Sequence, residues 1–378
     1  MAEIDPVELT AELIRCPSVT PVEGGAIDLL HRLLDDAGFV CTRIDQGGIA
    51  NLHAIWDRGG KILGFNGHTD VVPVGDPAAW THDPFGAEMS DGLVYGRGAC
   101  DMKSGVAAFV AAAIEHAGAG RPGSIAIAIT GDEEGDGIHG TPAILDWMDR
   151  TGARMDACIV GEPTCPETMG EMIKVGRRGS MTVWLTATGR QGHSAYPQNA
   201  RNPIHAMVAL LDRLIAFDLP DASDLFDPTS VQVTGFDTGN AANNVIPGQC
   251  RAMANIRFND AHRSSDLSEW IADEIAAVTR ATDVEFSTET KVSGESFVTE
   301  EGDFSRLIAR AVEAETGISP ILSTSGGTSD ARHIRAHCPV VEVGLVGRTM
   351  HQVDEYASID DIRTLKAIYS RILDAYAR

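Results

Sequence analysis

Hydrophobic residues in the first half of the chain gather in short runs that contain few polar positions. Such runs occupy residues 62–65, 124–130 and 157–160. They lack the apolar/polar alternation of half-exposed strands and are typical of strands buried on both faces of a mostly parallel sheet. Apolar residues at helical spacing occur beside them, at 27–37, 102–117 and 142–148. This alternation predicts an α/β fold with a mixed, mostly parallel sheet flanked by helices.

The pattern changes after Gly179. Strand-like segments then follow at 181–188, 230–236, 250–258 and 284–288, with helical patterns at 203–217 and 267–282. The order β-α-β-β-α-β predicts a ferredoxin-like α+β domain. From about residue 293 the α/β style returns, with helices near 304–316 and 360–376. We therefore expect a discontinuous larger domain over 1–178 and 293–378, with residues 179–292 inserted into it.

Composition narrows the classes of function. The chain has 378 residues, with 30 Lys and Arg against 54 Asp and Glu, a net charge of −24. Such an acidic surface repels phosphate backbones, so we do not expect nucleic-acid binding. The longest apolar run, 106–114, is too short to cross a bilayer, and the first residues resemble an acidic amphipathic helix rather than a signal peptide. The seven cysteines include no C-x-x-C pair, which indicates reduced thiols and a cytoplasmic protein.

Side chains of the kinds that bind metal follow several of the apolar runs. In α/β sheets, binding groups gather beyond the carboxyl ends of strands. One further candidate precedes the helix at 102–117. The candidates are His68 with Asp70, Asp101, Glu133 with Glu134, Glu162 and His351.

Each candidate also has an ordinary structural interpretation. His68 could be a core histidine beside a turn carboxylate, Asp101 a helix N-cap, and Glu133 with Glu134 a solvated turn. Taken together, two histidines and several carboxylates match a two-metal site, and mixed nitrogen and oxygen ligands suit zinc. One of two adjacent glutamates can then bind metal while the other acts as general base. The sequence contains no H-E-x-x-H and no G-x-S-x-G motif.

The motifs GHTDVVP, GRGACDMKSG, GDEEGDG and GEPT occur in this order, with His351 late in the chain. In this arrangement the chain resembles the M20 family of co-catalytic zinc peptidases and deacylases over essentially its whole length. Four further segments, 173–180, 189–197, 243–248 and 325–332, resemble one branch of that family. That branch hydrolyses N-succinyl-L,L-2,6-diaminopimelate to succinate and L,L-2,6-diaminopimelate in lysine and diaminopimelate biosynthesis. Acetylornithine deacetylases share the metal motifs but resemble these four segments less well.

The resemblance implies a role for each matching residue. His68 and Glu162 would bind one zinc ion, Glu134 and His351 the second, and Asp101 would bridge both, with a cis peptide to Met102. Glu133 would be the general base, Asp70 would orient His68, and His193 would reach across a dimer interface to stabilise the oxyanion. The implied cofactors are two Zn²⁺ per subunit, with Co²⁺ as a substitute, and the implied partners are a small-molecule substrate and a second copy in a homodimer. The implied substrate contacts are Lys174, Arg177, Asn243 or Asn244, and Gly327 with Thr328.

Two features leave alternatives open. Gly347 stands where that branch carries an asparagine, so the substrate contact is either missing or supplied by Arg348. Lys174, Arg177 and Arg178 form a basic segment, which is either a binding site for a substrate rich in carboxylates or a solvated surface strand.

The competing functions are another M20 amidohydrolase, such as an acetylornithine deacetylase or aminoacylase, and a non-catalytic metal-binding scaffold. Retention of every expected ligand together with Glu133 counts against the scaffold.

Overall fold

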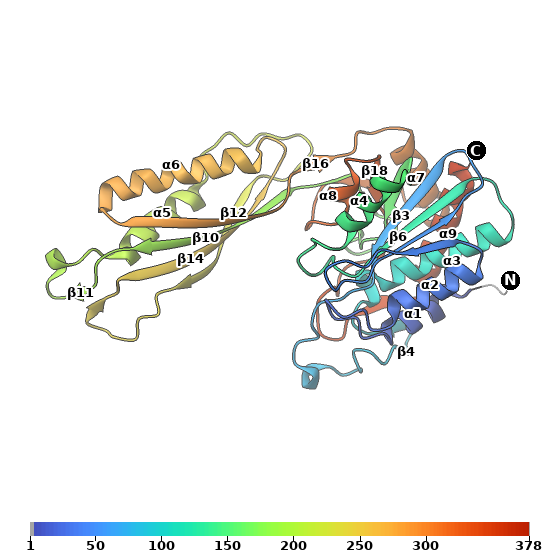
Figure 1. Ribbon diagram of the computed structural model, residues 1–378, viewed down its shortest axis with the longest axis horizontal. Coiled ribbons are helices and arrows are strands. Elements are labelled where there is room, and N and C mark those ends of the chain that lie inside the picture. The colour runs from blue at the N-terminus through green and yellow to red at the C-terminus, as the bar shows by residue number, and fades with distance from the viewer. Residues whose placement is uncertain (1–3, 378) are drawn as a thin grey trace. The chain divides into compact units, whose positions relative to one another are not determined.

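The computed structural model describes residues 4–377, which form two compact units (Figure 1). Unit 1 comprises the described residues up to Val175, Thr299–Ser323, and those from Ser329 onward. Unit 2 comprises Gly176–Val298 and Thr324–Thr328.

The centre of unit 1 is an eight-stranded mixed sheet with the strand order β1-β2-β6-β3-β7-β18-β8-β17. Strands β6, β3, β7 and β18 run parallel to one another, and β17 runs parallel to β8. The β1–β2, β2–β6 and β18–β8 pairs are antiparallel. The strands are β1 (Val40–Arg43), β2 (Leu52–Trp56), β3 (Ile62–His68), β6 (Ser124–Thr130), β7 (Ala157–Val160), β8 (Met172–Lys174), β17 (Ile321–Ser323) and β18 (Val340–Glu342).

The three predicted hydrophobic runs form the middle of this sheet. β6 and β7 are buried along their whole length, and β3 is buried from Leu63 to its end. The register places His68 beside Thr130 and Asn66 beside Val160. Because these strands are parallel, the segments that follow them emerge at the same edge of the sheet.

Helices cover the sheet of unit 1, in agreement with the predicted fold class. α3 packs along α9 (Figure 1), while α1 contacts α3 and α7 contacts α9. α2 contacts β1 and β2, and α4 contacts β6. The helices are α1 (Pro6–Ile14), α2 (Ala26–Asp36), α3 (Ser104–Gly118), α4 (Thr141–Thr151), α7 (Asp303–Thr316), α8 (Ala331–Ile334) and α9 (Ile359–Tyr376), with short helical turns at Pro77–Ala79 and Ala99–Lys103.

The predicted start of α3 at Met102 is wrong by two residues. Asp101 and Met102 have non-helical backbone angles, so the regular helix begins at Ser104. The peptide bond between Asp101 and Met102 is cis, as the family resemblance implies. A small antiparallel sheet of β4 (Glu88–Ser90), β5 (Leu93–Tyr95) and β19 (Tyr356–Ser358) completes unit 1.

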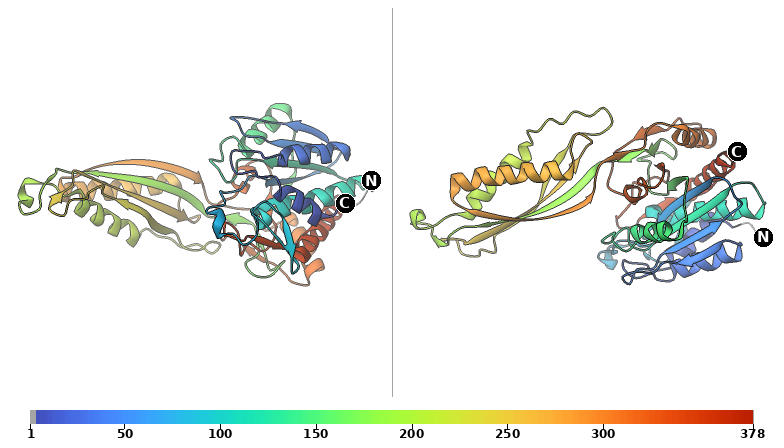
Figure 2. Two further views of the ribbon diagram at one scale, coloured as in Figure 1. Left: turned by 90° about the horizontal axis from the view of Figure 1, so that it is seen from below. Right: turned by 45° about the horizontal axis from the view of Figure 1, so that its top comes forward.

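Unit 2 contains a four-stranded antiparallel sheet with the order β12-β14-β10-β15. Figure 2 shows α5 and α6 along one face of this sheet, where Val183, Leu185, Leu210 and Ile256 are buried. The chain order of these elements is the predicted β-α-β-β-α-β. The elements are β10 (Gly179–Thr188), α5 (Pro203–Ala216), β12 (Ser230–Asp237), β14 (Gln249–Phe258), α6 (Ser264–Thr282) and β15 (Glu285–Gly294). Two short strand pairs accompany them: β9 (Gly176–Arg177) pairs with β16 (Phe297–Val298), and β11 (Gly192–His193) pairs with β13 (Val245–Ile246). A helical turn lies at Pro197–Asn199.

Within residues 4–377, no helix combines the length and the apolar character needed to cross a membrane.

Candidate metal centre and active site

The carboxyl ends of the central strands carry the predicted ligands. His68 is the last residue of β3, Glu133 and Glu134 lie just beyond β6, and Glu162 lies just beyond β7. Asp101 lies in the helical turn before α3, and His351 lies in the segment between β18 and β19. The sheet thus brings together side chains separated by up to 283 residues in sequence, from His68 to His351.

The first group of ligand-type side chains consists of His68, Asp101 and Glu162, all of them buried. His68 Nε2 lies 3.3 Å from Asp101 Oδ1 and 3.6 Å from Glu162 Oε1. The ring is held from its other side, because His68 Nδ1 lies 2.9 Å from the backbone carbonyl oxygen of Asp70. A histidine fixed in this way presents Nε2 to a ligand.

The second group consists of Asp101, Glu134 and His351. His351 Nε2 lies 2.9 Å from Glu134 Oε1 and 3.3 Å from Asp101 Oδ2. Asp101 therefore belongs to both groups, with Oδ1 directed at His68 and Oδ2 at His351. This is the arrangement expected of a carboxylate that bridges two cations.

The chemistry of these groups fits a cation. Among the described residues, His68 Nε2 and Asp101 Oδ1 are buried without a hydrogen-bond partner, which is costly unless another ligand satisfies them. Burial raises the pKa of Glu162 well above its usual range, and the charges of Asp101 and Glu133 add to this effect. Hydrogen bonds to Asp101 and Glu134 raise the pKa of His351 to about 10. A buried excess of carboxylates with two imidazoles is a donor set that suits zinc.

Glu133 lies beside these groups but belongs to neither. Its burial raises its pKa to about 8, whereas an ordinary solvated carboxylate titrates near pH 4. Its Oε1 lies 3.8 Å from Arg332 Nη1, and both side chains are 12% exposed. A nearly enclosed carboxylate next to the ligand groups is a suitable proton acceptor.

The Asp70 carboxylate contacts backbone groups of the glutamate segment. Asp70 Oδ1 accepts a hydrogen bond from Glu133 N at 3.2 Å, and Oδ2 accepts from Glu134 N at 3.0 Å and from Thr20 Oγ1 at 2.8 Å. Its Oδ1 lies farther from His68 Nδ1, at 3.7 Å. The carboxylate therefore fixes the segment after β6, and it is the Asp70 backbone carbonyl that makes the shorter contact with His68.

One glycine allows a close backbone contact behind Glu162. A Cβ atom at Gly344, just after β18, would lie 2.1 Å from the backbone oxygen of Glu162. No side chain fits in that space, so glycine is required for the segment after β18 to pack against the ligand-bearing turn.

The predicted substrate contacts fall into local sets. In unit 1, Lys174 is buried at the end of β8. In unit 2, Arg177 is buried, and its Nη1 donates to the carbonyl oxygens of Gly327 at 3.0 Å and Ser325 at 3.4 Å. The structure thus brings Arg177 to the Gly327–Thr328 segment. Arg348, the suggested replacement near Gly347, donates to Glu167 and to the Tyr356 hydroxyl group.

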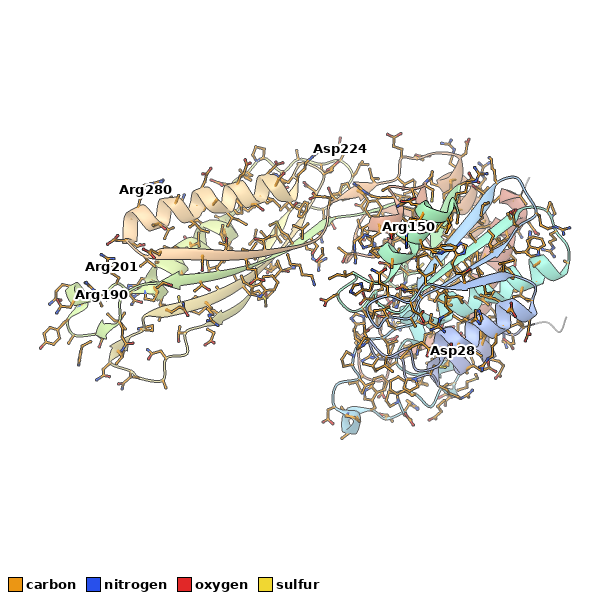
Figure 3. The ribbon with its side chains drawn as sticks, in the orientation of Figure 1. Asp28, Arg150, Arg190, Arg201, Asp224 and Arg280 are labelled. Atoms are coloured by element: carbon orange, nitrogen blue, oxygen red, sulfur yellow. The ribbon has the colours of Figure 1, made fainter. Side chains whose placement is uncertain are left out.

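His193, Asn243 and Asn244 form another local set, at one end of unit 2. β11 and β13 place His193 beside Val245, and Ser194 N donates to the backbone oxygen of Asn244. The His193 side chain is exposed, and its Nδ1 accepts from Ala195 N. Arg190 and Arg201, labelled in Figure 3, form a backbone bridge next to this set.

Two arginines with site-like environments were not among the predicted site residues. Arg332 contacts Glu133, as described above. On β14, the Nη1 atom of Arg257 is buried and has no hydrogen-bond partner in the described part of the chain. The same is true of the Nε atom of Arg178. Burial and the neighbouring Arg178 charge lower the pKa of Arg257. The partly buried Arg178 and Arg257 side chains are neighbours, and guanidinium groups suit an anionic ligand, but a lone arginine within a strand gives no motif that would identify it beforehand.

Comparisons with known proteins identify the family of the chain. The model of peptidase family M20/M25/M40 matches residues 64–375. Succinyl-diaminopimelate desuccinylase of Cereibacter sphaeroides is 61% identical over 99% of both chains. The protein of the same description from Ruegeria pomeroyi is 60% identical over 98% of both chains.

Solved structures share the fold at low sequence identity. A tripeptidase from Staphylococcus aureus has a TM-score of 0.83 at 18% identity, covering 100% of this chain and 99% of its own. A Bacillus subtilis protein described as a dinuclear metal binding peptidase of the M20 family has a TM-score of 0.75 at 15% identity, covering 98% and 97%. With a family model that spans most of its length and relatives at about 60% identity, the chain belongs to peptidase family M20/M25/M40.

Proposed function

We propose that this protein hydrolyses N-succinyl-L,L-2,6-diaminopimelate to succinate and L,L-2,6-diaminopimelate, in lysine and diaminopimelate biosynthesis. The observation that carries the reaction type is the pair of ligand groups that share Asp101, with Glu133 beside them. The substrate is supported by full-length relatives at 56–61% identity that are described as succinyl-diaminopimelate desuccinylases.

Two Zn²⁺ ions per chain are the proposed cofactors. His68 and Glu162 would hold one ion, Glu134 and His351 the other, and Asp101 both. Bound zinc supplies Lewis acidity, which lowers the pKa of water toward about 7 and polarises the amide carbonyl. Co²⁺ is a suitable substitute for the same donor set.

Glu133 acts as the general base. Its carboxylate takes a proton from the attacking water as the water oxygen bonds to the succinyl carbonyl carbon. The same carboxylate then gives the proton to the amide nitrogen as the carbon–nitrogen bond breaks, which leaves a carboxylate and an amine. The enclosed position of Glu133 beside the ligand groups suits both transfers.

The substrate carboxylates are held by cationic side chains. Lys174 and Arg177 are buried, and Arg177 already contacts the Gly327 segment through its guanidinium group. Arg can bind a carboxylate through two parallel hydrogen bonds. In a chain with a net charge of −24, such positions select an anionic substrate.

The active form is a homodimer in the cytoplasm, in which His193 from the second copy stabilises the oxyanion. Its exposed side chain and its place beside Asn243 and Asn244 support this role. In a test, equal amounts of the His193→Ala and Glu133→Gln proteins are mixed, dissociated and allowed to reassociate. Donation in trans restores about one quarter of the sites, because half the dimers are mixed and each has one intact site. A mixture as inactive as its parts contradicts donation in trans.

The substrate assignment is tested by kcat/KM on N-succinyl-L,L-2,6-diaminopimelate with N-acetylornithine run alongside, using zinc-reconstituted protein. We expect a preference of at least ~10³-fold for the succinyl substrate, about 4 kcal/mol of transition-state discrimination. A preference for the acetyl substrate would assign the protein to another activity within the family and direct attention to Gly347 and Arg177.

A further inference from the structure

A buried carboxylate outside both ligand groups organises the segment that carries Asp101. Glu355 is fully buried, and it lies four residues after His351. Its Oε1 accepts hydrogen bonds from Cys100 N at 3.0 Å and Asp101 N at 3.2 Å, and its Oε2 accepts from Gly98 N at 3.1 Å. Three backbone N–H groups within four residues therefore point at one carboxylate.

Arg97 connects this carboxylate to the segment that carries His351. Its Nη1 donates to Glu355 Oε2 at 2.7 Å and to the backbone oxygen of Gln352 at 3.2 Å. Its Nη2 donates to the backbone oxygen of His351 at 3.4 Å. The guanidinium group is buried and lies over the Trp80 ring, with 5.2 Å between Cζ and the ring centroid.

We propose that Glu355, with Arg97, is a positioning residue for the metal centre: it fixes the shared ligand Asp101 and the ligand His351 relative to each other before any metal binds. The inference rests on the proposed function only in taking these two residues as metal ligands. Neither Glu355 nor Arg97 is a ligand, since both are already engaged by the contacts above.

The contacts distinguish a carboxylate from its amide. Both oxygens of Glu355 face N–H donors, so glutamine must turn its NH₂ group toward one set of them. The substitution keeps the size of the side chain but breaks either the contact with Cys100 and Asp101 or that with Gly98 and Arg97. An ion pair that served only stability could be replaced with no effect on the ligands.

The test compares Glu355→Gln with wild type and with Leu365→Ala. This control removes buried apolar atoms on α9, outside the segments that carry Asp101 and His351. The readouts are Zn²⁺ affinity by chelator competition, the visible spectrum of the Co²⁺-loaded protein, the melting temperature of the metal-free protein, and kcat at saturating metal. We expect Glu355→Gln to lose 10–100-fold in Zn²⁺ affinity, to alter the Co²⁺ spectrum and to lower kcat with KM little changed. Leu365→Ala lowers the metal-free melting temperature but retains the affinity and the spectrum.

Arg97→Lys serves as a second variant, because it keeps the charge but not the forked contacts with the His351 segment. We expect it to weaken Zn²⁺ binding and to perturb the Co²⁺ spectrum even if Glu355→Gln fails to fold. Wild-type affinity and spectrum in the folded variants overturn the proposal, and so does an equal loss of affinity in Leu365→Ala. The affinity, spectrum and melting temperature need no substrate, so a wrong substrate assignment appears separately, as wild-type protein that binds metal but does not hydrolyse the succinyl compound.

Discussion

The Asp70 carboxylate accepts a hydrogen bond from the backbone N–H of Glu133 at 3.2 Å. Together with its bond to Glu134 N, this contact holds the proposed base and a proposed ligand in one fixed turn. In Asp70→Asn, one oxygen becomes an NH₂ group that faces a backbone donor. We expect kcat to fall about 10–100-fold with KM little changed, as measured by steady-state kinetics at saturating zinc.

The matched control for this prediction is Asp57→Asn. Asp57 also accepts a backbone N–H, from Gly59, and a Ser124 hydroxyl, but it follows β2 and takes no part in either ligand group. We expect its kcat to stay close to that of wild type. Equal activities of the two variants would mean that the contact between Asp70 and the glutamate segment does not matter for catalysis.

Gly344 is predicted to control the position of Glu162. In Gly344→Ala the new Cβ must displace the Glu162 backbone oxygen, from which it would lie 2.1 Å. We expect at least about a tenfold loss of zinc affinity, in the range seen when support for a metal ligand is removed. Gly302→Ala is a suitable control, because Gly302 lies just before α7 with extended backbone, and a Cβ there would lie no closer than 3.7 Å to another atom, the Glu300 backbone oxygen. Zinc affinity by chelator competition checks the prediction, and unchanged affinity in Gly344→Ala contradicts it.

Zinc is expected to stabilise unit 1 against heat. A ligand at 100 times its dissociation constant stabilises the folded state by about 2.7 kcal/mol, which corresponds to about 5–10 °C for a unit of this size. The measurement is the melting temperature in a chelator and at increasing free zinc. Asp101→Asn should lose most of the rise, because Asp101 belongs to both ligand groups. An equal rise in that variant would place the stabilising ion elsewhere.

His53 gives stability a pH dependence that is independent of the metal centre. The ring lies in β2 beside Trp147, and its burial lowers its pKa to about 4. The unfolded state therefore takes up this proton near pH 6.5, and the folded state only near pH 4. Stability is lost as the pH falls from about 6.5 to about 4, by about 3 kcal/mol in total.

Replacing this ring removes that component. Between pH 7 and pH 5, the free energy of unfolding of His53→Leu in the presence of a chelator should fall by about 2 kcal/mol less than that of wild type. His205→Leu, which changes an exposed histidine, should behave as wild type. Urea unfolding at the two pH values measures the difference, and equal losses in all three proteins would show that His53 does not carry it.

Sequence periodicity predicted strand bounds well where the burial pattern is clear along the whole strand. The runs that became β6 and β7 match their strands end to end, because both faces of each strand are buried. β15 extends six residues beyond its predicted end at Thr288, because it continues to pair with β10 through residues that are largely exposed. Backbone pairing of this kind leaves no hydrophobic pattern to detect.

The ligand candidates could be predicted because most of them stand in motifs that follow apolar runs, and because His351 completes the set. Features that depend only on tertiary contacts could not be predicted from the sequence. The segment Thr324–Thr328 groups with unit 2 through contacts such as that of the Thr324 hydroxyl with the Leu225 carbonyl. Arg97 and Glu355 form an ion pair although they are 258 residues apart in sequence. No sequence pattern around either residue predicts this contact.

We expect Glu133 to move the proton while the two ligand groups that share Asp101 hold the metal. The most direct measurement is the metal content and kcat of Glu133→Gln on the succinyl substrate. We predict about two zinc ions per chain, as in wild type, and a loss of kcat of about 10²–10⁴-fold, the range for removal of a general base. Near-normal kcat with both ions bound would contradict the account.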